Sequence, residues 1–236
     1  MRDQIIFVTG ATGHQGSTAI RHLLEAGFKV RGLTRWPNKP EAKLLEDLGA
    51  EMVHGDLNDP AMIRRSMEGC YGVFAVLTPF EVGPAMEVKQ GKLLADVAKE
   101  AGVEHFLYSS VGGADRNTGI PHFKSKWQNE QYMRQIGLPL TILRPVFFME
   151  NFNNPAMIKM IASGRLLFPY GPSKQLQMIA TEDIGFFTAI VLDNKDDWLG
   201  RAVEIAGDSM TLPQMAQRFA RVLGHPVEFV EQPPRR

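Results

Sequence analysis

The sequence has little of the features that mark secreted, membrane-bound or polyanion-binding proteins. Of its 236 residues one is a cysteine, Cys70, which excludes an intramolecular disulfide, fits a reducing compartment and is interpreted as a small core residue. Lysine plus arginine and aspartate plus glutamate number 26 each, so no net charge draws the chain to nucleic acid or to an anionic membrane. Any polyanion that it binds must therefore be small.

Long hydrophobic runs are also absent. The longest apolar stretch, Phe186 to Leu192, is far too short to span a bilayer. The first predicted strand begins almost at Met1, which leaves no room for a signal or transit peptide. We therefore expect a cytoplasmic protein, or a nuclear one, with no membrane partner.

Metal and hydrolase motifs are missing as well. The six histidines show no metal-ligand spacing, and no G-x-S-x-G elbow occurs. The histidines are His14, His22, His54, His105, His122 and His225. The sequence therefore predicts no metal site.

A glycine-rich turn near the N-terminus organises the chain. An apolar, β-branched run starting at Ile5 breaks into Gly10, Gly13 and Gly16, spaced by three. A buried strand would turn at Gly10 and open a helix near His14, so that free backbone N–H groups converge on a point that suits a phosphate. On its own, the motif fits a purely structural strand-to-helix turn equally well.

Strand-like and helix-like segments then alternate. Strands are predicted at 29–34, 50–54, 71–77, 103–109 and 138–143, and helices at 17–26, 40–48, 60–68, 82–101 and 121–136. Strands separated by helices imply right-handed crossovers and a parallel sheet covered on both faces. The predicted fold class is α/β, a doubly wound parallel Rossmann sheet over residues 1–145.

Residues 146–236 are expected to form a smaller α+β lobe. Helices are predicted at 154–162, 181–192 and 211–223, and strands at 165–170, 175–180 and 201–206. Thr211 and Gln214 form a capping box at the start of the last helix. The lobe should form a cleft over the carboxyl ends of the strands, within the same globular unit.

The end of the second strand indicates which dinucleotide binds. Folds that prefer NAD place a carboxylate there to bond the ribose 2′-hydroxyl, whereas this chain has Arg35 and no carboxylate until Glu41. A guanidinium would meet a 2′-phosphate with charge-assisted bonds, which favours NADP(H) over NAD(H). Asp56 is expected either beside the adenine edge or in a turn ahead of Pro60.

The chain resembles the NmrA-like group of atypical short-chain dehydrogenases. The resemblance is carried by V-T-G-A-T-G-H-Q-G from Val8, V-R-G-L-T-R from Val30, H-G-D from His54, V-K-Q-G-K-L-L-A-D-V-A from Val88, H-F-K-S-K from His122 and R-P-V-F-F-M-E-N from Arg144. It implies an NADP(H)-binding Rossmann domain with a small C-terminal lobe. It also implies that the loop after Pro145, with Phe147 and Phe148, passes the nicotinamide.

Candidate catalytic residues lie on the helix after the fifth strand. Short-chain reductases commonly use Tyr-x-x-x-Lys, and here His122 and Lys126 occupy that register on one helical face, with Ser110 facing them. His122 is either a proton donor or a residue that positions the helix or the cofactor. Lys126 is expected to hold the nicotinamide ribose. Tyr108 is expected to pack beneath the site.

The residues predicted to contact the cofactor can be stated together. They are Gly10, Thr12, Gly13, His14, Gln15, Gly16, Arg35, Asp56, Leu57, Thr78, Lys126, Pro145 and Phe148.

Two classes of function fit these predictions. The missing tyrosine favours an NADP(H)-dependent redox sensor with a regulatory protein partner. The alternative is an NADPH-dependent oxidoreductase that reduces a quinone or a small carbonyl compound. A nucleic-acid-binding regulator is disfavoured because no basic stripe or helix-turn-helix signal occurs. A homodimer remains open.

Overall fold

The computed structural model describes residues 2–232, which form two compact units. Unit 1 comprises Met1–Pro145 and Thr181–Ile205, and unit 2 comprises Val146–Ala180 and Ala206–Arg236. The predicted boundary at Pro145 coincides with the end of the first segment of unit 1. The prediction that every residue beyond it belongs to the small lobe needs correction, because Thr181–Ile205 returns to unit 1.

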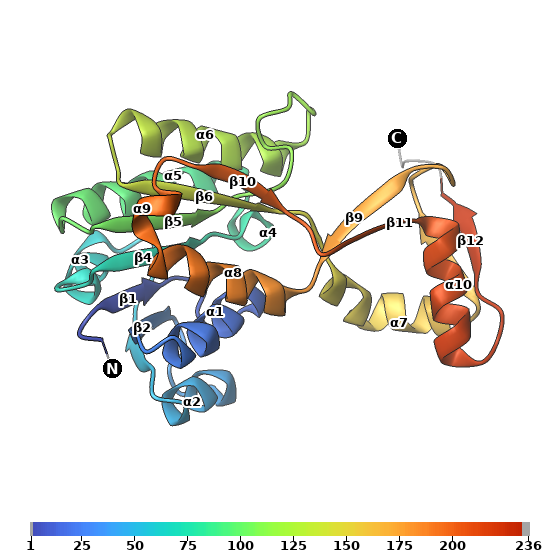
Figure 1. The fold of residues 1–236 in the computed structure, drawn as a ribbon, viewed down its shortest axis with the longest axis horizontal. Coiled ribbons are helices and arrows are strands. Elements are labelled where there is room, and N and C mark those ends of the chain that lie inside the picture. Colours follow the sequence, from blue (N-terminus) through green and yellow to red (C-terminus); the bar gives the residue numbers. More distant parts are fainter. Residues whose placement is uncertain (1, 233–236) are drawn as a thin grey trace. The chain divides into compact units, whose positions relative to one another are not determined.

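Unit 1 is built on a seven-stranded sheet in which every neighbouring pair is parallel. Its strands are β1 (Ile5–Val8), β2 (Lys29–Thr34), β3 (Glu51–His54), β4 (Gly72–Val76), β5 (His105–Ser109), β6 (Leu140–Pro145) and β10 (Ala202–Ile205). They lie in the order β10-β6-β5-β4-β1-β2-β3 (Figure 1). The predicted doubly wound sheet is confirmed, and its order reverses between β1 and β4, where such sheets bind ligands at their carboxyl ends.

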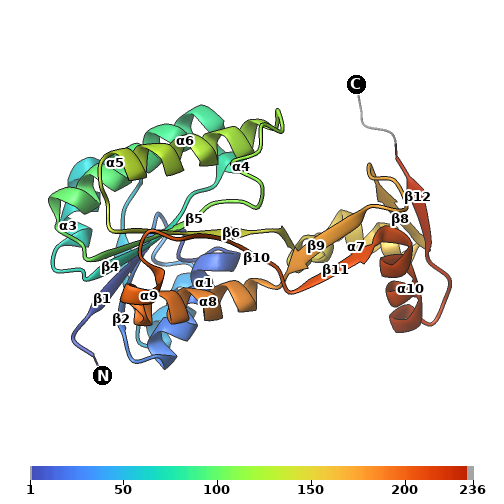
Figure 2. The same cartoon turned by 45° about the horizontal axis from the view of Figure 1, so that its top comes forward.

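Helices cover both faces of this sheet. They are α1 (His14–Glu25), α2 (Pro40–Asp47), α3 (Pro60–Met67), α4 (Pro79–Val82), α5 (Pro84–Glu100), α6 (Pro121–Gln135), α8 (Thr181–Asp193) and α9 (Lys195–Trp198). Figure 2 shows α3, α5 and α6 on one face and α1, α8 and α9 on the other. The helices α2 to α6 all begin with proline, whose fixed φ suits the first helical position.

The helix predicted over 82–101 is present as α5, and the short helix α4 ahead of it was not predicted. Gly83, at φ +83°, turns the backbone into the left-handed region and separates α4 from α5. The short α4 therefore stands apart at the end of β4.

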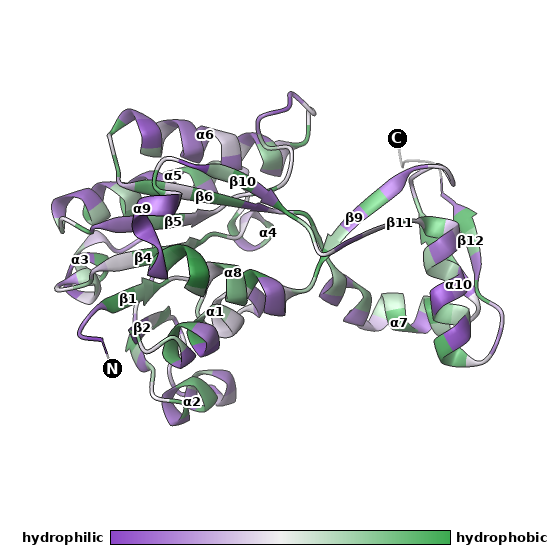
Figure 3. Ribbon diagram, in the orientation of Figure 1, coloured by the Kyte–Doolittle hydropathy of each residue, from purple (hydrophilic) through white to green (hydrophobic). Residues whose placement is uncertain are grey.

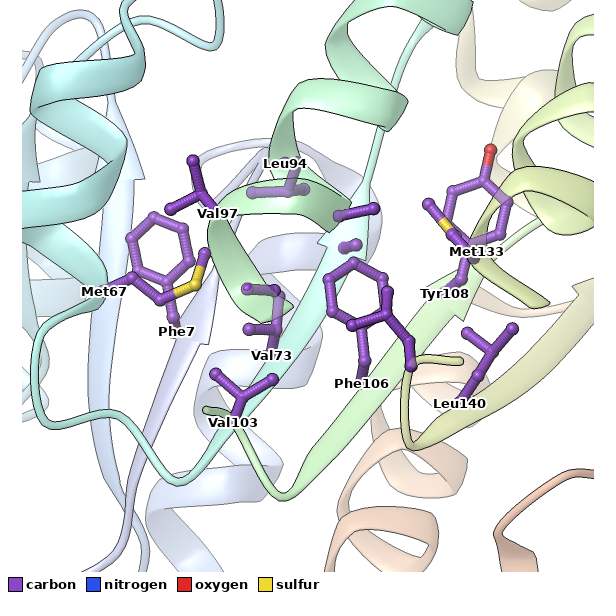
Figure 4. Close-up of a cluster of buried hydrophobic side chains, with 14 of the residues drawn as sticks. Phe7, Met67, Val73, Leu94, Val97, Val103, Phe106, Tyr108, Met133 and Leu140 are labelled. Carbon is purple, nitrogen blue, oxygen red and sulfur yellow. The ribbon is translucent and has the colours of Figure 1, made fainter. Parts of the chain in front are cut away.

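The larger core lies between the sheet and α3, α5 and α6. Phe7, Val73 and Phe106 rise from three strands toward Leu94 and Val97 of α5, and all five are fully buried (Figure 4). Full burial of a side chain of this size contributes about 1.5–3 kcal/mol.

The second segment of unit 1 is fixed by α8 and β10. A Cβ added at Gly185 of α8 would lie 2.7 Å from the carbonyl carbon of Thr18, so only glycine permits this helix to lie against α1. The Thr18 hydroxyl donates to the Thr181 carbonyl at 2.9 Å. At the sheet edge β10 pairs with β6.

Unit 2 contains two small sheets, one in the order β11-β9-β7 and one pairing β12 with β8. Its elements are β7 (Phe147–Phe148), the 3₁₀ helix η1 (Met149–Asn153), α7 (Pro155–Ala162), β8 (Arg165–Phe168), β9 (Gln175–Ile179), β11 (Asp208–Thr211), α10 (Leu212–Leu223) and β12 (Glu228–Glu231). The predicted capping box of Thr211 and Gln214 is confirmed at the start of α10. Helix α10 has both hydrophobic and hydrophilic residues along its length (Figure 3), and it buries its apolar side in a core rich in phenylalanine and methionine.

None of the helices within residues 2–232 is both long and apolar enough to cross a membrane. Among the same residues, no group of three His, Cys, Asp or Glu side chains is placed to hold a metal ion.

His105 is a fully buried histidine at the start of β5. Its Nε2 lies 2.8 Å from the Thr141 hydroxyl, which itself donates to the Trp198 carbonyl, so Nε2 carries the donated hydrogen. Burial, with a smaller contribution from the charge of Lys195, lowers the pKa of His105 from 6.5 to about 4. The folded state therefore excludes a proton that the unfolded chain accepts.

We expect His105 to make unit 1 acid-sensitive. Between pH 6.5 and 4, His105 is protonated in the unfolded chain but mostly neutral in the folded protein. The free energy of unfolding should therefore fall by about 3 kcal/mol over this range. Urea unfolding followed by tryptophan fluorescence reports on unit 1, because Trp36, Trp127 and Trp198 all lie there. His105→Gln should remove most of this drop.

The exposed His54 supplies the control, since His54→Gln should retain the acid sensitivity of the wild type. Equal losses of stability for the wild type and His105→Gln between pH 7 and 4 would contradict the assignment.

Candidate functional site

The glycine turn joins β1 to α1 at the carboxyl edge of the sheet. Gly10 has φ +62°, which glycine adopts without strain. A Cβ at Gly16 would lie 2.1 Å from the Gly10 carbonyl oxygen, so this residue must be glycine for α1 to pack on the turn. The predicted roles of these two glycines in backbone geometry agree with the structure.

Gly13 occupies the N-cap position of α1 and offers no side-chain cap. The first amides of any helix lack carbonyl partners within it, and the first turn of α1 has no acidic residue. Among the described residues, a Cβ at Gly13 would meet one atom within 4 Å, the Gly10 carbonyl oxygen at 3.3 Å. Gly13 is exposed and no other described atom lies within 4 Å of that Cβ position, so an anion can approach the first amides of α1.

Two side-chain contacts tie this turn to neighbouring strands. The Thr9 hydroxyl donates to the Val76 carbonyl and accepts from the Val76 amide, both at 2.8 Å, which joins β1 to the end of β4. Ser109, at the end of β5, donates to Oε1 of Gln15 at 2.6 Å. His14 is exposed and Thr12 half-buried. Gln15 therefore uses its side chain to hold the turn, which leaves its backbone amide for a ligand.

Lys126 is buried beneath this edge. Its Nζ donates to the carbonyls of Leu77 and Ser109, at 2.8 and 3.2 Å, and lies 2.9 Å from Oε1 of Glu87. The ammonium also lies 5.3 Å from the ring centroid of Tyr108. Burial lowers the pKa of Lys126, and the charge of Glu87 opposes that shift. Two hydrogen bonds and one ion pair thus hold the ammonium inside the protein.

Glu87 of α5 is fully buried and was not predicted as a site residue. Besides Lys126, it accepts a hydrogen bond from the Ser125 hydroxyl on Oε2. Its backbone carbonyl accepts from Nδ2 of Asn129, and a Cβ at Gly91 would collide with that amide at 2.3 Å. The close approach of α5 to α6 therefore depends on glycine at this position.

Tyr108 packs under the site, as predicted. It is fully buried, and burial raises the pKa of its phenol well above 10. Its hydroxyl accepts from Nδ2 of Asn129 at 3.3 Å. Tyr108 therefore stays protonated and supports Lys126 from below.

Ser110 belongs to a second buried network. Its hydroxyl donates to Oε1 of Glu130 at 2.6 Å, and Glu130 also accepts two bonds from Arg144, from Nε at 3.0 Å and Nη2 at 2.7 Å. Arg144 reaches Asp115 in the loop after β5, and Arg134 reaches Glu130 from the helix surface. The structure thus directs Ser110 toward Glu130 rather than toward Lys126.

His122 lies in the first turn of α6, half-buried between two aromatic rings. Its ring centroid is 5.3 Å from that of Phe80 in α4 and 4.9 Å from that of Phe123. Burial, together with the charge of Lys126 and against that of Glu87, lowers its pKa from 6.5. The imidazole is therefore mainly uncharged at pH 7.

Arg35 follows β2 directly, as predicted, and its side chain is 50% exposed. Its Nη2 donates to Oε2 of Glu81 in α4 at 2.6 Å. The ion pair was not predicted, because 46 residues separate its members in the sequence.

The remaining predicted residues divide between the two units. Asp56 accepts from the amide and side chain of Asn58, both at 2.7 Å, and so forms a turn ahead of α3. Leu57 packs against the larger core, and exposed Thr78 is the N-cap residue of α4 without a side-chain cap. Pro145 ends β6 in unit 1. Phe148 belongs to β7 in unit 2, where it pairs with β9.

Five residues of the candidate site were not predicted from the sequence: Thr9, Glu81, Glu87, Glu130 and Arg144. A signal existed for Glu87, which precedes the buried Gly91 and Leu94 by four and seven residues, the spacing of one helical face. The corresponding signal for Glu130 is its four-residue distance from the buried Lys126. A charge on a buried helical face needs a partner, so these positions could have been suspected.

Comparison with known proteins identifies the family. The sequence profile of the NmrA-like family matches residues 2–236. An NmrA-like family domain-containing protein of Dictyostelium discoideum is 26% identical over 239 residues, covering 95% of this chain and 79% of that protein.

Two solved structures are similar over almost the whole chain. NmrA, described as a negative transcriptional regulator, has a TM-score of 0.87 at 26% identity, covering 98% of this chain and 75% of NmrA. The triphenylmethane reductase of Citrobacter sp., solved as a complex with NADP(H), has a TM-score of 0.84 at 25% identity, covering 98% of this chain and 79% of the reductase. With the profile match and the parallel Rossmann-type sheet, these similarities establish that this chain belongs to the NmrA-like family.

Proposed function

We propose that the protein binds NADP(H) at the carboxyl edge of unit 1 and acts as a redox sensor or regulatory binder with little or no reductase activity. The proposal rests on one observation: some polar groups at this edge can be reached by a ligand, and others are bonded to partners inside the protein. A ligand can reach the glycine turn and Arg35, whose partner Glu81 is also exposed, whereas Lys126 and Ser110 are bonded to buried partners.

The turn fits a pyrophosphate. Gly13 leaves space in front of the first amides of α1, and the helix N-terminus carries partial positive charge without an acidic residue to neutralise it. Arg35 at the end of β2 supplies a planar, permanently charged donor where a ribose 2′-phosphate would lie. Together these groups favour NADP(H) over NAD(H).

Within the part of the chain that the structure describes, the same edge offers no well-placed side chain to donate a proton to a substrate. A reductase of small carbonyl compounds needs an acid near the developing alkoxide. The Ser110 hydroxyl donates to Glu130, and the Lys126 ammonium donates to Leu77 and Ser109 beside Glu87. His122 is mainly uncharged and packs against Phe80. These contacts support a binding role rather than acid-assisted reduction.

Similar proteins support cofactor binding and regulation together. NmrA has been solved with NADP and with NAD, and it is described as a transcriptional regulator. We extend the regulatory role to this chain, with a protein partner as the recipient of the signal and no direct contact with nucleic acid.

An NADPH-dependent oxidoreductase is the second candidate. It is favoured by the similarity to the triphenylmethane reductase, which was solved with NADP(H). Bound NADPH would supply the hydride, and a quinone needs less help from a protein acid than a carbonyl compound does. His122 and Lys126 would then position the cofactor, and a quinone is the preferred class of substrate.

We expect Gly13→Val to abolish binding of NADPH without unfolding the protein. The φ of −86° at Gly13 is accessible to valine, but the branched side chain would fill the space in front of the turn. Isothermal titration calorimetry measures binding, and circular dichroism checks the fold. Gly171→Val in unit 2 is the matched control and should bind as the wild type does. Unchanged affinity of Gly13→Val would leave the turn with a structural role alone.

Arg35→Ala should weaken NADPH binding by about 1.5–3 kcal/mol and leave NADH binding nearly unchanged, because only NADPH presents a 2′-phosphate to the guanidinium. Titration of both nucleotides measures the difference. Arg64→Ala is a fitting control, since Arg64 also forms an exposed pair with a glutamate, Glu100. Equal losses for NADPH and NADH in Arg35→Ala would refute the 2′-phosphate role.

A further inference from the structure

Glu81 holds the arginine that the proposed function assigns to the 2′-phosphate. Arg35 follows β2 and Glu81 lies in α4 after β4, and both strands are neighbours of β1 in the sheet. The Arg35–Glu81 ion pair, 2.6 Å between Nη2 and Oε2, therefore crosses the carboxyl end of β1, where the glycine turn begins. It spans the place at which the adenosine ribose of a bound dinucleotide is expected.

The pair is easily opened. The side chains of Arg35 and Glu81 are 50% and 55% exposed, and exposed ion pairs contribute little to stability. Glu81 also lies on a helix of four residues that begins without a side-chain cap and ends at Gly83. An anion that binds the Arg35 guanidinium more strongly can therefore displace Glu81 without disturbing the core.

A 2′-phosphate and Glu81 carry charges of the same sign. When a 2′-phosphate approaches Arg35, Glu81 must either release the guanidinium or remain as a repelling charge beside the phosphate. A cofactor that has a 2′-hydroxyl instead brings no charge to this place. Glu81 thus opposes NADP(H) and has little effect on NAD(H).

We propose that Glu81 is a specificity-determining residue that narrows the preference for 2′-phosphorylated nucleotides by competing with the phosphate for Arg35. The inference rests on the proposed binding of NADP(H). Arg35 then favours NADP(H) over NAD(H), and Glu81 makes this preference smaller. The ratio of NADPH to NADH affinity is then set by two residues from different elements.

Titration calorimetry with four ligands tests the inference without any measurement of turnover. NADPH and 2′,5′-ADP carry the 2′-phosphate, whereas NADH and 5′-AMP lack it. Glu81→Gln keeps the size and hydrogen-bonding capacity of the side chain and removes its charge. We expect NADPH and 2′,5′-ADP to bind about three- to tenfold more tightly to this variant, and NADH and 5′-AMP to change less than twofold.

Two further variants isolate the cause. Glu100→Gln breaks an exposed pair with Arg64 whose side chains are 55% and 53% exposed, and it should leave all four affinities unchanged. In the Arg35→Ala background, adding Glu81→Gln should change NADPH affinity less than twofold, because the competition requires Arg35. A gain that persists without Arg35 would overturn competition as the mechanism.

The outcomes separate this inference from the proposed function. If the wild type binds none of the four ligands, the proposed function is refuted and the inference falls with it. If the wild type binds NADPH but Glu81→Gln binds it equally or more weakly, the inference alone is overturned. An equal gain for NADH and NADPH would likewise overturn it.

Discussion

The buried ion pair of Lys126 and Glu87 is the interaction on which the carboxyl edge of unit 1 depends. It joins α6 to α5, and the same ammonium binds the carbonyls at the ends of β4 and β5. Removing two charges from water is costly, so such a pair is weak evidence for stability in itself. Its consequence here is positional, because it fixes the strand ends that border the glycine turn. Gln15 and Ser109 extend this arrangement to α1.

The arrangement also underlies our proposal of a binding role rather than acid-assisted reduction. The lysine expected to reach the nicotinamide ribose is held below the edge by two backbone carbonyls and the Glu87 carboxylate, and Ser110 is held by Glu130. By contrast, Arg35 and the amides of the glycine turn lie at accessible positions. At this edge Lys126 and Ser110 are bonded to buried partners, whereas a ligand can reach the glycine turn and the exposed Arg35–Glu81 pair.

Much of the fold could be predicted from the sequence, because the glycine turn, the helix-starting prolines and the alternation of strands and helices are local signals. The six strands predicted for the Rossmann sheet are present, and Arg35 stands at the end of β2. The return of Thr181–Ile205 to unit 1 could not be predicted, since it depends on the fit of Gly185 against Thr18 and on the pairing of β10 with β6. The strands β7, β11 and β12 have two to four residues each, too few to show a period.

The sequence predicted the backbone geometry of the candidate site but not its charge pairs. A glycine spacing reports on local geometry, whereas the pairing of Arg35 with Glu81 and of Lys126 with Glu87 is decided by tertiary packing across 46 and 39 residues of chain. The helical spacing of Glu87 with Gly91 and Leu94 indicated burial, but not the partner. The chemistry of the edge therefore follows from contacts between elements, which a single sequence records only weakly.

The central claim is that the protein binds NADP(H) without acid-assisted reduction, and one experiment tests it most directly. The wild type is titrated with NADPH by fluorescence and, at saturation, the absorbance of NADPH is followed after addition of a panel of aldehydes and quinones. We predict saturable binding of NADPH and no consumption with any aldehyde. Sustained oxidation of NADPH by an aldehyde, lost in His122→Ala while NADPH affinity is unchanged, would contradict the account and establish an acid-assisted reductase.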